Sequence, residues 1–390
     1  MPAVEIETYG CAMNQADSET MAGLLSGAGF DIRAGAQILV INTCTVKTPT
    51  ERKIRKRLRE LQDSGKTVIV AGCLPAASEE IADEFPNFSF IGLNVSDIVE
   101  AAKRSLGGEV FVKIREGSCR LKMPHIRGNP YIEIVPIAQG CVGCCSYCIT
   151  RQARGHLVSC PPELILERVR TAVSEGIEEV WITAQDTGAY GKDLDDSGSR
   201  DLPALLDEIV AVEGVFRVRV GMMGPNHALG MLSSLINSFG NEKIYKFLHI
   251  PVQSGDDGVL RDMNRRYGAG DFIRLVCEFR RRFPDITIST DVIVGFPTES
   301  EEAFHNTLKL IGLIRPDVLN ITRFWVRPGT QASTMKQLPT RISKDRSRLM
   351  NKLFQEIGFE NNKRWVGCEG KVLVSKRGRE GSFIARNFAY

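Results

Sequence analysis

The stretch IEIVPIAQGCVGCCSYCIT, residues 132–150, decides the fold of this chain. Its apolar, β-branched beginning predicts a buried strand. The strand leads into Cys141, Cys145 and Cys148, which form a CxxxCxxC run. Three thiolates from one short loop can hold three irons of a 4Fe–4S cube and leave the fourth iron open. A zinc site, which takes four closed ligands, and buried free cysteines are the alternatives.

Apolar runs continue downstream with helical segments between them, which indicates a β/α alternation. Five more strand candidates follow the first: EVWITA at 179–184, FRVRVGM at 216–222, FLHIPV at 247–252, ITISTDVIVG at 286–295 and VLNITRFWV at 318–326. Six strands with intervening helices predict a partial, open (β/α)6 barrel of the TIM type. The active site of such a barrel lies at the carboxyl ends of the strands.

Upstream, three apolar runs each end in a cysteine: VEIETYGC at 4–11, ILVINTC at 38–44 and TVIVAGC at 67–73. Helical segments at about 17–28 and 51–64 separate them, so a parallel α/β domain is predicted. The carboxyl ends of parallel strands share one edge of a sheet, where open α/β sheets bind ligands. We therefore expect Cys11, Cys44 and Cys73 to converge as candidate metal ligands. The alternative is that each is a small buried residue, as free cysteine often is.

These patterns divide the chain into parts: an N-terminal domain at 1–118, a linker at 119–127, the barrel at 128–362 and a small β module at 363–390. The last part carries seven basic residues against two acidic ones. This local excess of five positive charges exceeds the +3 of the whole chain. A basic surface of this kind favours an RNA partner.

The composition places the protein among ordinary globular proteins, with 43% hydrophobic and 25% charged residues. No apolar run is long enough to cross a bilayer and no secretion signal begins the chain, so we expect a cytoplasmic protein without a membrane partner. Eleven cysteines in that compartment predict reduced thiols. Cys119, Cys160, Cys277 and Cys368 have no ligand pattern and are interpreted as structural. The five scattered histidines are interpreted as ordinary residues.

The CxxxCxxC motif with Tyr147 before its last cysteine is similar to that of the radical S-adenosylmethionine (SAM) superfamily. The segments AQDTGAYG, LHIPVQSGDDG, STDVIVGFPTESEEAF and RFWVRPGT extend the resemblance over most of the chain. It implies that SAM binds the open iron. It also implies contacts to SAM from Tyr147, Gln185, Asp186, Gln253, Gly295, Phe296 and Pro297, and no catalytic residue beyond the cluster ligands.

Two details depart from the superfamily pattern. Cys144 stands where relatives often have asparagine, and a ligand set with Cys144 in place of Cys145 would not match the motif. GFPTES stands at 295–300 where relatives usually have GFPGET.

The N-terminal cysteines resemble those of methylthiotransferases, in which three such residues hold an auxiliary 4Fe–4S cluster. The segments NTCTVKTPTE and ITRQARGHLVSCPPE resemble the archaeal and eukaryotic branch of that family, and the C-terminal segment resembles an incomplete TRAM domain. Together these imply two 4Fe–4S clusters, SAM, an electron donor such as ferredoxin or flavodoxin, and 2-methylthiolation of N6-threonylcarbamoyladenosine in the anticodon stem-loop of tRNA. Open alternatives are the isopentenyladenosine enzyme, a radical enzyme whose second cluster only transfers electrons, and a non-catalytic iron–sulfur RNA-binding protein.

Overall fold

The computed structural model describes residues 1–78, 80–114, 117–194 and 200–390. It separates into two compact units. The first unit comprises Met1–Gly143, Cys148–Arg168 and Thr183–Gln185. The second unit comprises Cys144–Tyr147, Val169–Ile182 and Asp186–Tyr390. The domain boundaries expected from the sequence stay a prediction.

The elements up to residue 159 alternate strands with helices, as expected. They are β1 Ala3–Thr8, α1 Ala12–Gly27, β2 Asp31–Ile32, β3 Ile38–Thr43, α2 Thr48–Gln62, β4 Thr67–Gly72, α3 Cys73–Ala77, α4 Ile81–Glu84, β5 Ser89–Ile91, η1 Val95–Asp97, α5 Ile98–Leu106, β6 Val112–Lys113, β7 Ile132–Pro136, β8 Ala138–Gln139, α6 Thr150–Arg154 and β9 Val158–Ser159.

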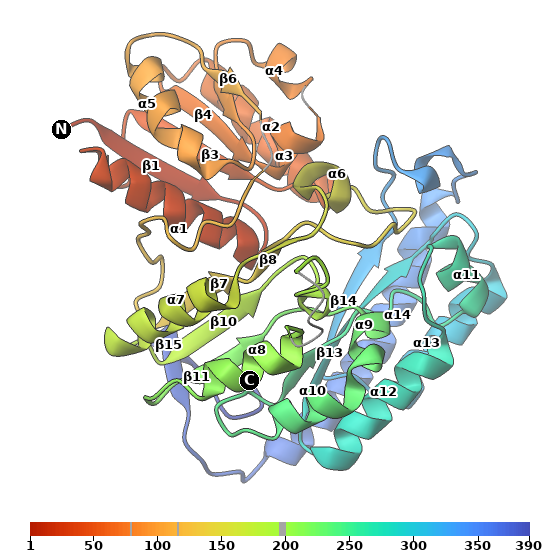
Figure 1. The fold of residues 1–390 in the computed structure, drawn as a ribbon. Helices are drawn as coiled ribbons and strands as arrows, with labels where there is room; N and C mark the ends of the chain where they lie inside the picture. The colour runs from red at the N-terminus through yellow and green to blue at the C-terminus, as the bar shows by residue number, and fades with distance from the viewer. Residues whose placement is uncertain (79, 115–116, 195–199) are drawn as a thin grey trace. The chain divides into compact units, whose positions relative to one another are not determined.

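The core of the first unit is a parallel sheet covered by helices on both faces (Figure 1). Its strand order is β2-β1-β3-β4-β5-β6, and every neighbouring pair is parallel. Along β3, Ile38 and Val40 pack with α1 and α5, whereas Leu39 and Ile41 pack with α2, α3 and α4. Because successive side chains of a strand point to opposite faces, a strand that is apolar throughout needs helices on both sides.

From residue 162 onward the β/α alternation continues to a long helix and a final hairpin. The elements are α7 Pro162–Ser174, β10 Glu179–Thr183, η2 Thr187–Ala189, α8 Leu202–Val210, β11 Arg217–Val220, α9 Pro225–Gly230, α10 Leu232–Phe239, β12 Phe247–His249, α11 Asp257–Asp262, α12 Ala269–Arg282, β13 Thr287–Val294, α13 Glu301–Ile314, β14 Val318–Arg323, η3 Gln331–Thr334, α14 Thr340–Asn362, η4 Lys363–Trp365, β15 Leu373–Arg377 and β16 Phe383–Arg386.

Parallel pairing runs through the second unit. β10 pairs with β11, and β12, β13 and β14 form a sheet in that order. A parallel bridge between Val218 and Ile244 links β11 to the segment that leads into β12. All six strands expected between residues 128 and 326 are present, so the predicted α/β class with parallel sheets is confirmed.

The C-terminal segment forms one antiparallel hairpin, β15 with β16. Its end packs within the second unit, where Arg386 Nη1 lies 3.3 Å from Glu179 Oε2. The ring of Tyr390 lies 5.1 Å from that of Tyr245 and 4.9 Å from that of Phe247. The incomplete TRAM-like barrel expected of this segment stays a prediction.

One expectation about the cysteines is wrong. Cys119 and Cys160 form a disulfide, with their Cα atoms 5.5 Å apart, although reduced thiols were expected throughout. The two residues are 41 positions apart, so only the packing of the segment that follows residue 117 brings them together. Arg120, the residue after Cys119, is 4% exposed. Cys277 and Cys368 are exposed, and Cys368 Sγ donates to the carbonyl of Arg364 at 3.2 Å; their structural role stays a prediction.

Across the described residues, no helix has both the length and the apolar character needed to cross a membrane.

Candidate functional site

The cysteines Cys11, Cys44 and Cys73, the strand-end trio, follow three neighbouring parallel strands of the first unit. Cys44 comes directly after β3 and Cys73 directly after β4. Cys11 is the N-cap residue of α1, three positions after the end of β1. Because β1, β3 and β4 are adjacent and parallel, their carboxyl ends share one edge. The expected placement at strand ends is confirmed, whereas the role of the three residues as ligands stays a prediction.

Side chains of α1 and β3 fix Cys11 beside Cys44. Asn14 Nδ2 donates to the carbonyl of Thr43 at 2.7 Å, and Asn42 Nδ2 donates to the carbonyl of Asn14 at 2.8 Å. A Cβ placed on Gly10, whose φ is +115°, would lie 2.9 Å from Cys44 Cβ. Only glycine therefore fits where the chain enters α1.

A hydroxyl group links the ends of β3 and β4. Thr43 Oγ1 donates to the carbonyl of Ala71 at 2.6 Å and accepts from the backbone N–H of Leu74 at 3.1 Å. The turn between them passes through Gly72, with φ of +94°. These contacts hold the start of α3, and with it Cys73, against the residue before Cys44.

Asn14 Oδ1 is a common neighbour of two of the sulfurs. Cys11 Sγ lies 3.6 Å from this oxygen and Cys73 Sγ lies 3.9 Å from it. Burial raises the pKa of the Cys73 thiol to about 11; Arg154 opposes this rise, and the neighbouring Cys44 and Cys11 add to it. The three thiols thus lie close enough to influence one another electrostatically.

Arg154, the last residue of α6, brings a buried positive charge to this edge. Its Nε lies 3.3 Å from Cys73 Sγ, and its Nη2 donates to Asn14 Oδ1 at 3.1 Å and to Asp17 Oδ2 at 2.8 Å. The sequence analysis missed this residue. The available signal was an arginine in TRQARG just after the cysteine loop, together with the polar residues Asn14 and Asp17 three positions apart on a mostly buried helix.

Within the described residues, no group of three or more His, Cys, Asp or Glu side chains is arranged to hold a single metal ion. A mononuclear zinc site requires its ligands around one centre at about 2.0–2.3 Å. In a 4Fe–4S cube each thiolate binds its own iron, so the sulfurs stand farther apart. The donor set of the strand-end trio, three thiols and an adjacent cation, fits a cube better than a single ion.

The second group, Cys141, Cys145 and Cys148, is called the loop trio. In the first unit, the backbone N–H of Gly143 donates to Cys141 Sγ at 3.2 Å, and the N–H of Cys141 donates to the carbonyl of Gly155 at 3.3 Å. Gly140 precedes the loop with φ of +76°. The three cysteines are partly exposed, and Cys144 is exposed.

Residues 144–147 are fixed within the second unit by the segment after α11. Asn264 Nδ2 donates to the carbonyl of Cys144 at 2.8 Å, and Ser146 Oγ donates to the carbonyl of Asp262 at 2.7 Å. Arg265 Nη2 donates to the Tyr147 hydroxyl at 2.5 Å. Burial lowers the pKa of Arg265, but Tyr147, Tyr267 and Cys145 outweigh it and raise that pKa well above its ordinary value.

Gln185 and Asp186, two of the residues expected near SAM, are adjacent in the sequence but have different hydrogen-bond partners. Gln185 Oε1 accepts the N–H of Gly140 at 2.7 Å, directly before Cys141. Asp186 is engaged within the protein: its Oδ1 accepts from Gly188 and Gly224, and its Oδ2 lies 3.0 Å from His227 Nδ1. Asp186 therefore shapes the loop after β10, and His227 is a partner that sequence reasoning missed.

Gln253 and Gly295 have unusual backbone conformations. Gln253 has φ of +70° and is 9% exposed. A positive φ costs a non-glycine residue about 1–2 kcal/mol. Gly295 has φ of +78°, and its N–H donates to Glu299 Oε2 at 2.6 Å. Both residues belong to the second unit, at or after the ends of β12 and β13.

The next two positions of that loop, Phe296 and Pro297, continue from Gly295. Phe296 is fully buried, with its ring 6.4 Å from that of Tyr147. Of the residues expected near SAM, the structure thus brings Tyr147 and Phe296 together.

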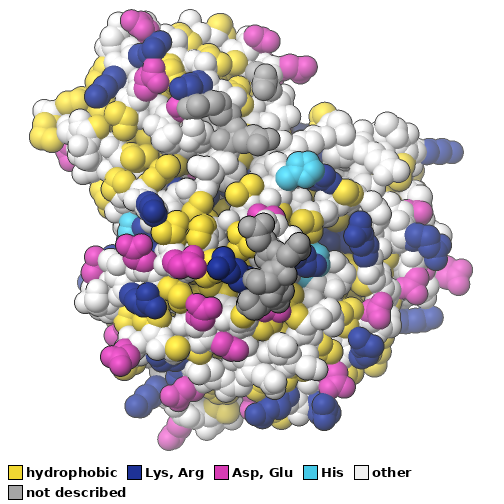
Figure 2. Space-filling model, in the orientation of Figure 1, with side chains coloured by type: hydrophobic (Ala, Val, Ile, Leu, Met, Phe, Trp, Pro, Cys, Tyr) yellow, Lys and Arg dark blue, Asp and Glu magenta, His cyan; other side chains and the backbone are white. Residues whose placement is uncertain are grey.

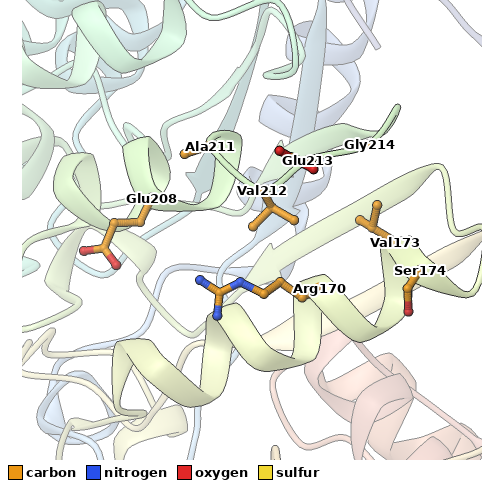
Figure 3. Close-up of a pocket in the computed structure, with 8 residues that line it drawn as sticks. All are labelled: Arg170, Val173, Ser174, Glu208, Ala211, Val212, Glu213 and Gly214. Atoms are coloured by element: carbon orange, nitrogen blue, oxygen red, sulfur yellow. The ribbon is translucent and has the colours of Figure 1, made fainter.

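One hollow of about 650 Å³ lies elsewhere in the second unit (Figure 3). It is lined by Arg170, Val173, Ser174, Glu208, Ala211, Val212, Glu213 and Gly214. These residues come from α7, from the end of α8 and from the segment between α8 and β11, which precedes β11 rather than following a strand. It is therefore not at the carboxyl ends, where a β/α barrel has its active site.

Charged side chains of both signs are interspersed on the face drawn in Figure 2. The C-terminal segment differs in its sequence, because residues 363–390 have an excess of positive charge.

Two family models match the chain. The model described as uncharacterized protein family UPF0004 matches residues 3–92, and the Radical SAM superfamily model matches residues 135–311. The first match contains the strand-end trio and the second contains the loop trio.

Curated relatives match over nearly the full length. The probable threonylcarbamoyladenosine tRNA methylthiotransferase of Pyrococcus abyssi is 46% identical, over 100% of this chain and 92% of the relative. The relative of the same name from Archaeoglobus fulgidus is 46% identical, over 99% and 91%. The threonylcarbamoyladenosine tRNA methylthiotransferase of Danio rerio is 40% identical, over 100% and 73%.

Solved structures share the fold. The radical S-adenosylmethionine methyltransferase TsrM from Kitasatospora setae matches with a TM-score of 0.60 and 13% identity, over 85% of this chain and 77% of that one. The cobalamin-dependent radical enzyme OxsB matches with a TM-score of 0.57 and 11% identity, over 92% and 56%. Because relatives of this name match nearly its full length, the chain belongs to the threonylcarbamoyladenosine tRNA methylthiotransferase family of radical SAM enzymes.

Proposed function

We propose that this radical SAM methylthiotransferase converts N6-threonylcarbamoyladenosine beside the anticodon of tRNA into its 2-methylthio derivative. The observation that carries the substrate is the similarity over nearly the whole chain to relatives named for this nucleoside. The same similarity favours threonylcarbamoyladenosine over isopentenyladenosine.

Membership of the radical SAM superfamily implies one 4Fe–4S cluster and SAM. We assign that cluster to the loop trio and a second cluster to the strand-end trio. When bound, the first cluster and SAM supply a radical that can take hydrogen from the unactivated C2–H bond of adenine, and the second supplies sulfur. The protein provides binding, orientation and electrostatics for such cofactors.

The side chains around the loop trio would orient SAM rather than react with it. Gln185 accepts the N–H of Gly140, which fixes the amide group beside the loop. Tyr147 is held between Arg265 and Phe296, so its ring cannot rotate freely. Gly295 leaves open backbone beside Phe296 and Pro297, where a Cβ would instead collide with Ser343 at 2.5 Å.

The remaining partners follow from this chemistry. Reduction of a cluster requires a low-potential electron donor, for which we propose a ferredoxin or flavodoxin, and tRNA implies a cytoplasmic enzyme. We propose that the basic residues of 363–390 contact the tRNA backbone, because lysine and arginine contacts to phosphate provide most of the sequence-independent affinity.

The test is mass spectrometry of tRNA nucleosides after anaerobic incubation with reductant and SAM. Separate incubations contain tRNA bearing threonylcarbamoyladenosine and tRNA bearing isopentenyladenosine. We expect a methylthio group to be added to the first nucleoside. Addition only to the second would move the enzyme to the sister branch. Release of 5′-deoxyadenosine without methylthiolation of either would indicate a different radical enzyme, and no release would indicate a non-catalytic protein.

A further inference from the structure

Two buried arginines share one carboxylate beneath the strand-end trio. Asp17 Oδ2 lies 2.8 Å from Arg154 Nη2, and Asp17 Oδ1 lies 2.5 Å from Arg120 Nη2. The three side chains are 2%, 1% and 4% exposed, in the order Asp17, Arg154 and Arg120. Among the residues that the structure describes, Asp17 is the only carboxylate paired with either arginine. The group therefore has one more positive than negative charge among buried side chains.

Burying an unbalanced charge is costly, and a buried cation is normally opposed by an anion. Arg120 Nη1 donates to Gln139 Oε1 at 3.0 Å rather than to one of the cysteines. Arg154 directs its contacts toward them, with Nε 3.3 Å from Cys73 Sγ. Its Nη1 is buried and has no hydrogen-bond partner in the described part of the chain. The excess charge thus faces the sulfurs.

The backbone that carries Arg154 is itself fixed against the trio. α6 begins two residues after Cys148, and its Ala153 packs in a buried cluster with Cys73 and Leu93. The guanidinium group therefore has little freedom to move away from Cys73.

We propose that Arg154 is a positioning residue of the strand-end trio, whose guanidinium group contacts the Cys73 sulfur and balances the charge of a bound cube. This inference rests on the proposed second cluster. Three thiolates outweigh the positive charge of the core of the cube, so the assembled group is an anion. A charge-assisted hydrogen bond to a thiolate is stronger than a neutral one. Hydrogen bonds to sulfur and local charge set the reduction potential of such clusters.

The experiment uses the full chain with Cys141, Cys145 and Cys148 changed to alanine, so that one cluster signal remains. After anaerobic reconstitution with iron and sulfide, the midpoint potential is followed by electron paramagnetic resonance, and iron loss to a chelator is timed. Arg154→Gln should lower the midpoint potential, because reduction then lacks a nearby cation, and should speed iron loss several-fold. Arg154→Lys, which keeps the charge, should recover most of the midpoint potential.

Two further variants separate charge from structure. Arg120→Gln disturbs the same carboxylate and removes one positive charge but leaves the contact between Arg154 and Cys73 in place, so its shift should be less than half that of Arg154→Gln. Asp17→Asn removes the opposing anion and should shift the midpoint potential upward. This opposite sign decides the question if Arg154→Gln does not fold.

Equal shifts for Arg154→Gln and Arg120→Gln, or a downward shift for Asp17→Asn, would overturn the role of Arg154. If the background chain takes up no cluster, the proposed second cluster itself fails. If a cluster forms and its midpoint potential is the same with and without Arg154, only the present inference fails.

Discussion

The two groups of cysteines are built in opposite ways. The strand-end trio collects residues separated by 33 and 29 positions at the edge of one sheet, and buried hydrogen bonds from Asn14, Asn42 and Thr43 hold them. The loop trio lies within eight consecutive residues, 141–148. The first group therefore depends on tertiary structure and the second mainly on local sequence. Changes in the fold should damage the first group before the second.

The largest effect we expect separates the two groups by their chemistry. Cys145→Ala should reduce 5′-deoxyadenosine release and methylthiolation to background, because the loop trio then lacks a ligand. Cys44→Ala should leave 5′-deoxyadenosine release within about twofold of wild type and abolish methylthiolation. Chromatography of the two products measures both, with the exposed Cys277→Ala as a control that should change neither. Loss of 5′-deoxyadenosine release in Cys44→Ala would contradict the assignment of separate chemical roles to the two groups.

The turn before Cys73 tests how strongly the strand-end trio depends on the fold. Gly72→Ala places a Cβ 2.4 Å from Asn42 Oδ1 and 2.7 Å from the carbonyl of Thr43, at φ of +94°. We expect a loss of about 2–4 kcal/mol in the free energy of unfolding, together with loss of the strand-end iron. Denaturant unfolding and iron analysis measure these.

Gly65→Ala is the matched control for that variant. Its φ is +70°, but its Cβ would meet no atom within 4 Å, so only the backbone cost of about 1 kcal/mol applies. Equal losses in the two variants would show that crowding at the end of β4 has no part in the effect.

The stability of the protein should depend on pH through α1, the helix that carries Asn14 and Asp17. Burial raises the pKa of Glu19 on α1 from 4.5 to about 7, with the Gly128 N–H opposing the rise. Between these values the folded protein binds a proton that the unfolded chain releases. Stability should therefore fall by about 1–3 kcal/mol as the pH rises through this range. Urea titrations at about pH 5 and pH 7.5 measure it, and Glu19→Gln should flatten this part of the profile. A rise in stability over the same range would contradict it.

The smallest effect concerns the strained backbone in the second unit. Gln253→Gly should increase the free energy of unfolding by about 1 kcal/mol, because φ of +70° costs glycine little. If Gln253 contacts SAM as proposed, the same change should weaken SAM binding, as measured by calorimetry with the reconstituted protein. Unchanged binding would remove Gln253 from the proposed contacts.

Sequence patterns predicted the strands because each is apolar and bounded by turn residues, as in ILVINTC and TVIVAGC. Strand order in a parallel sheet then placed Cys11, Cys44 and Cys73 on one edge without any contact information. The loop trio was visible in its spacing alone. The strands and their shared edge were predictable because the apolar pattern is a local property; the ligand role of both trios stays a prediction.

Contacts between distant segments were not predictable in this way. Arg154 reaches Asp17 over 137 positions, and no local pattern marks that pairing. The Cys119–Cys160 disulfide likewise depends on packing after residue 117. The contacts of Asp186 were also not visible in the sequence: its two oxygens hold the backbone of Gly188 and Gly224 and the ring of His227. Its expected approach to SAM stays a prediction. Only the folded loop reveals how a carboxylate is used.

The central claim is that each group of cysteines holds its own cluster, and iron analysis tests it most directly. Three anaerobically reconstituted proteins are compared: the wild type, a variant with the strand-end trio changed to alanine and a variant with the loop trio changed to alanine. We expect iron and sulfide for two cubes in the wild type and for one cube in each variant. A wild type with one cube, or a strand-end variant that keeps the full iron content, would contradict it.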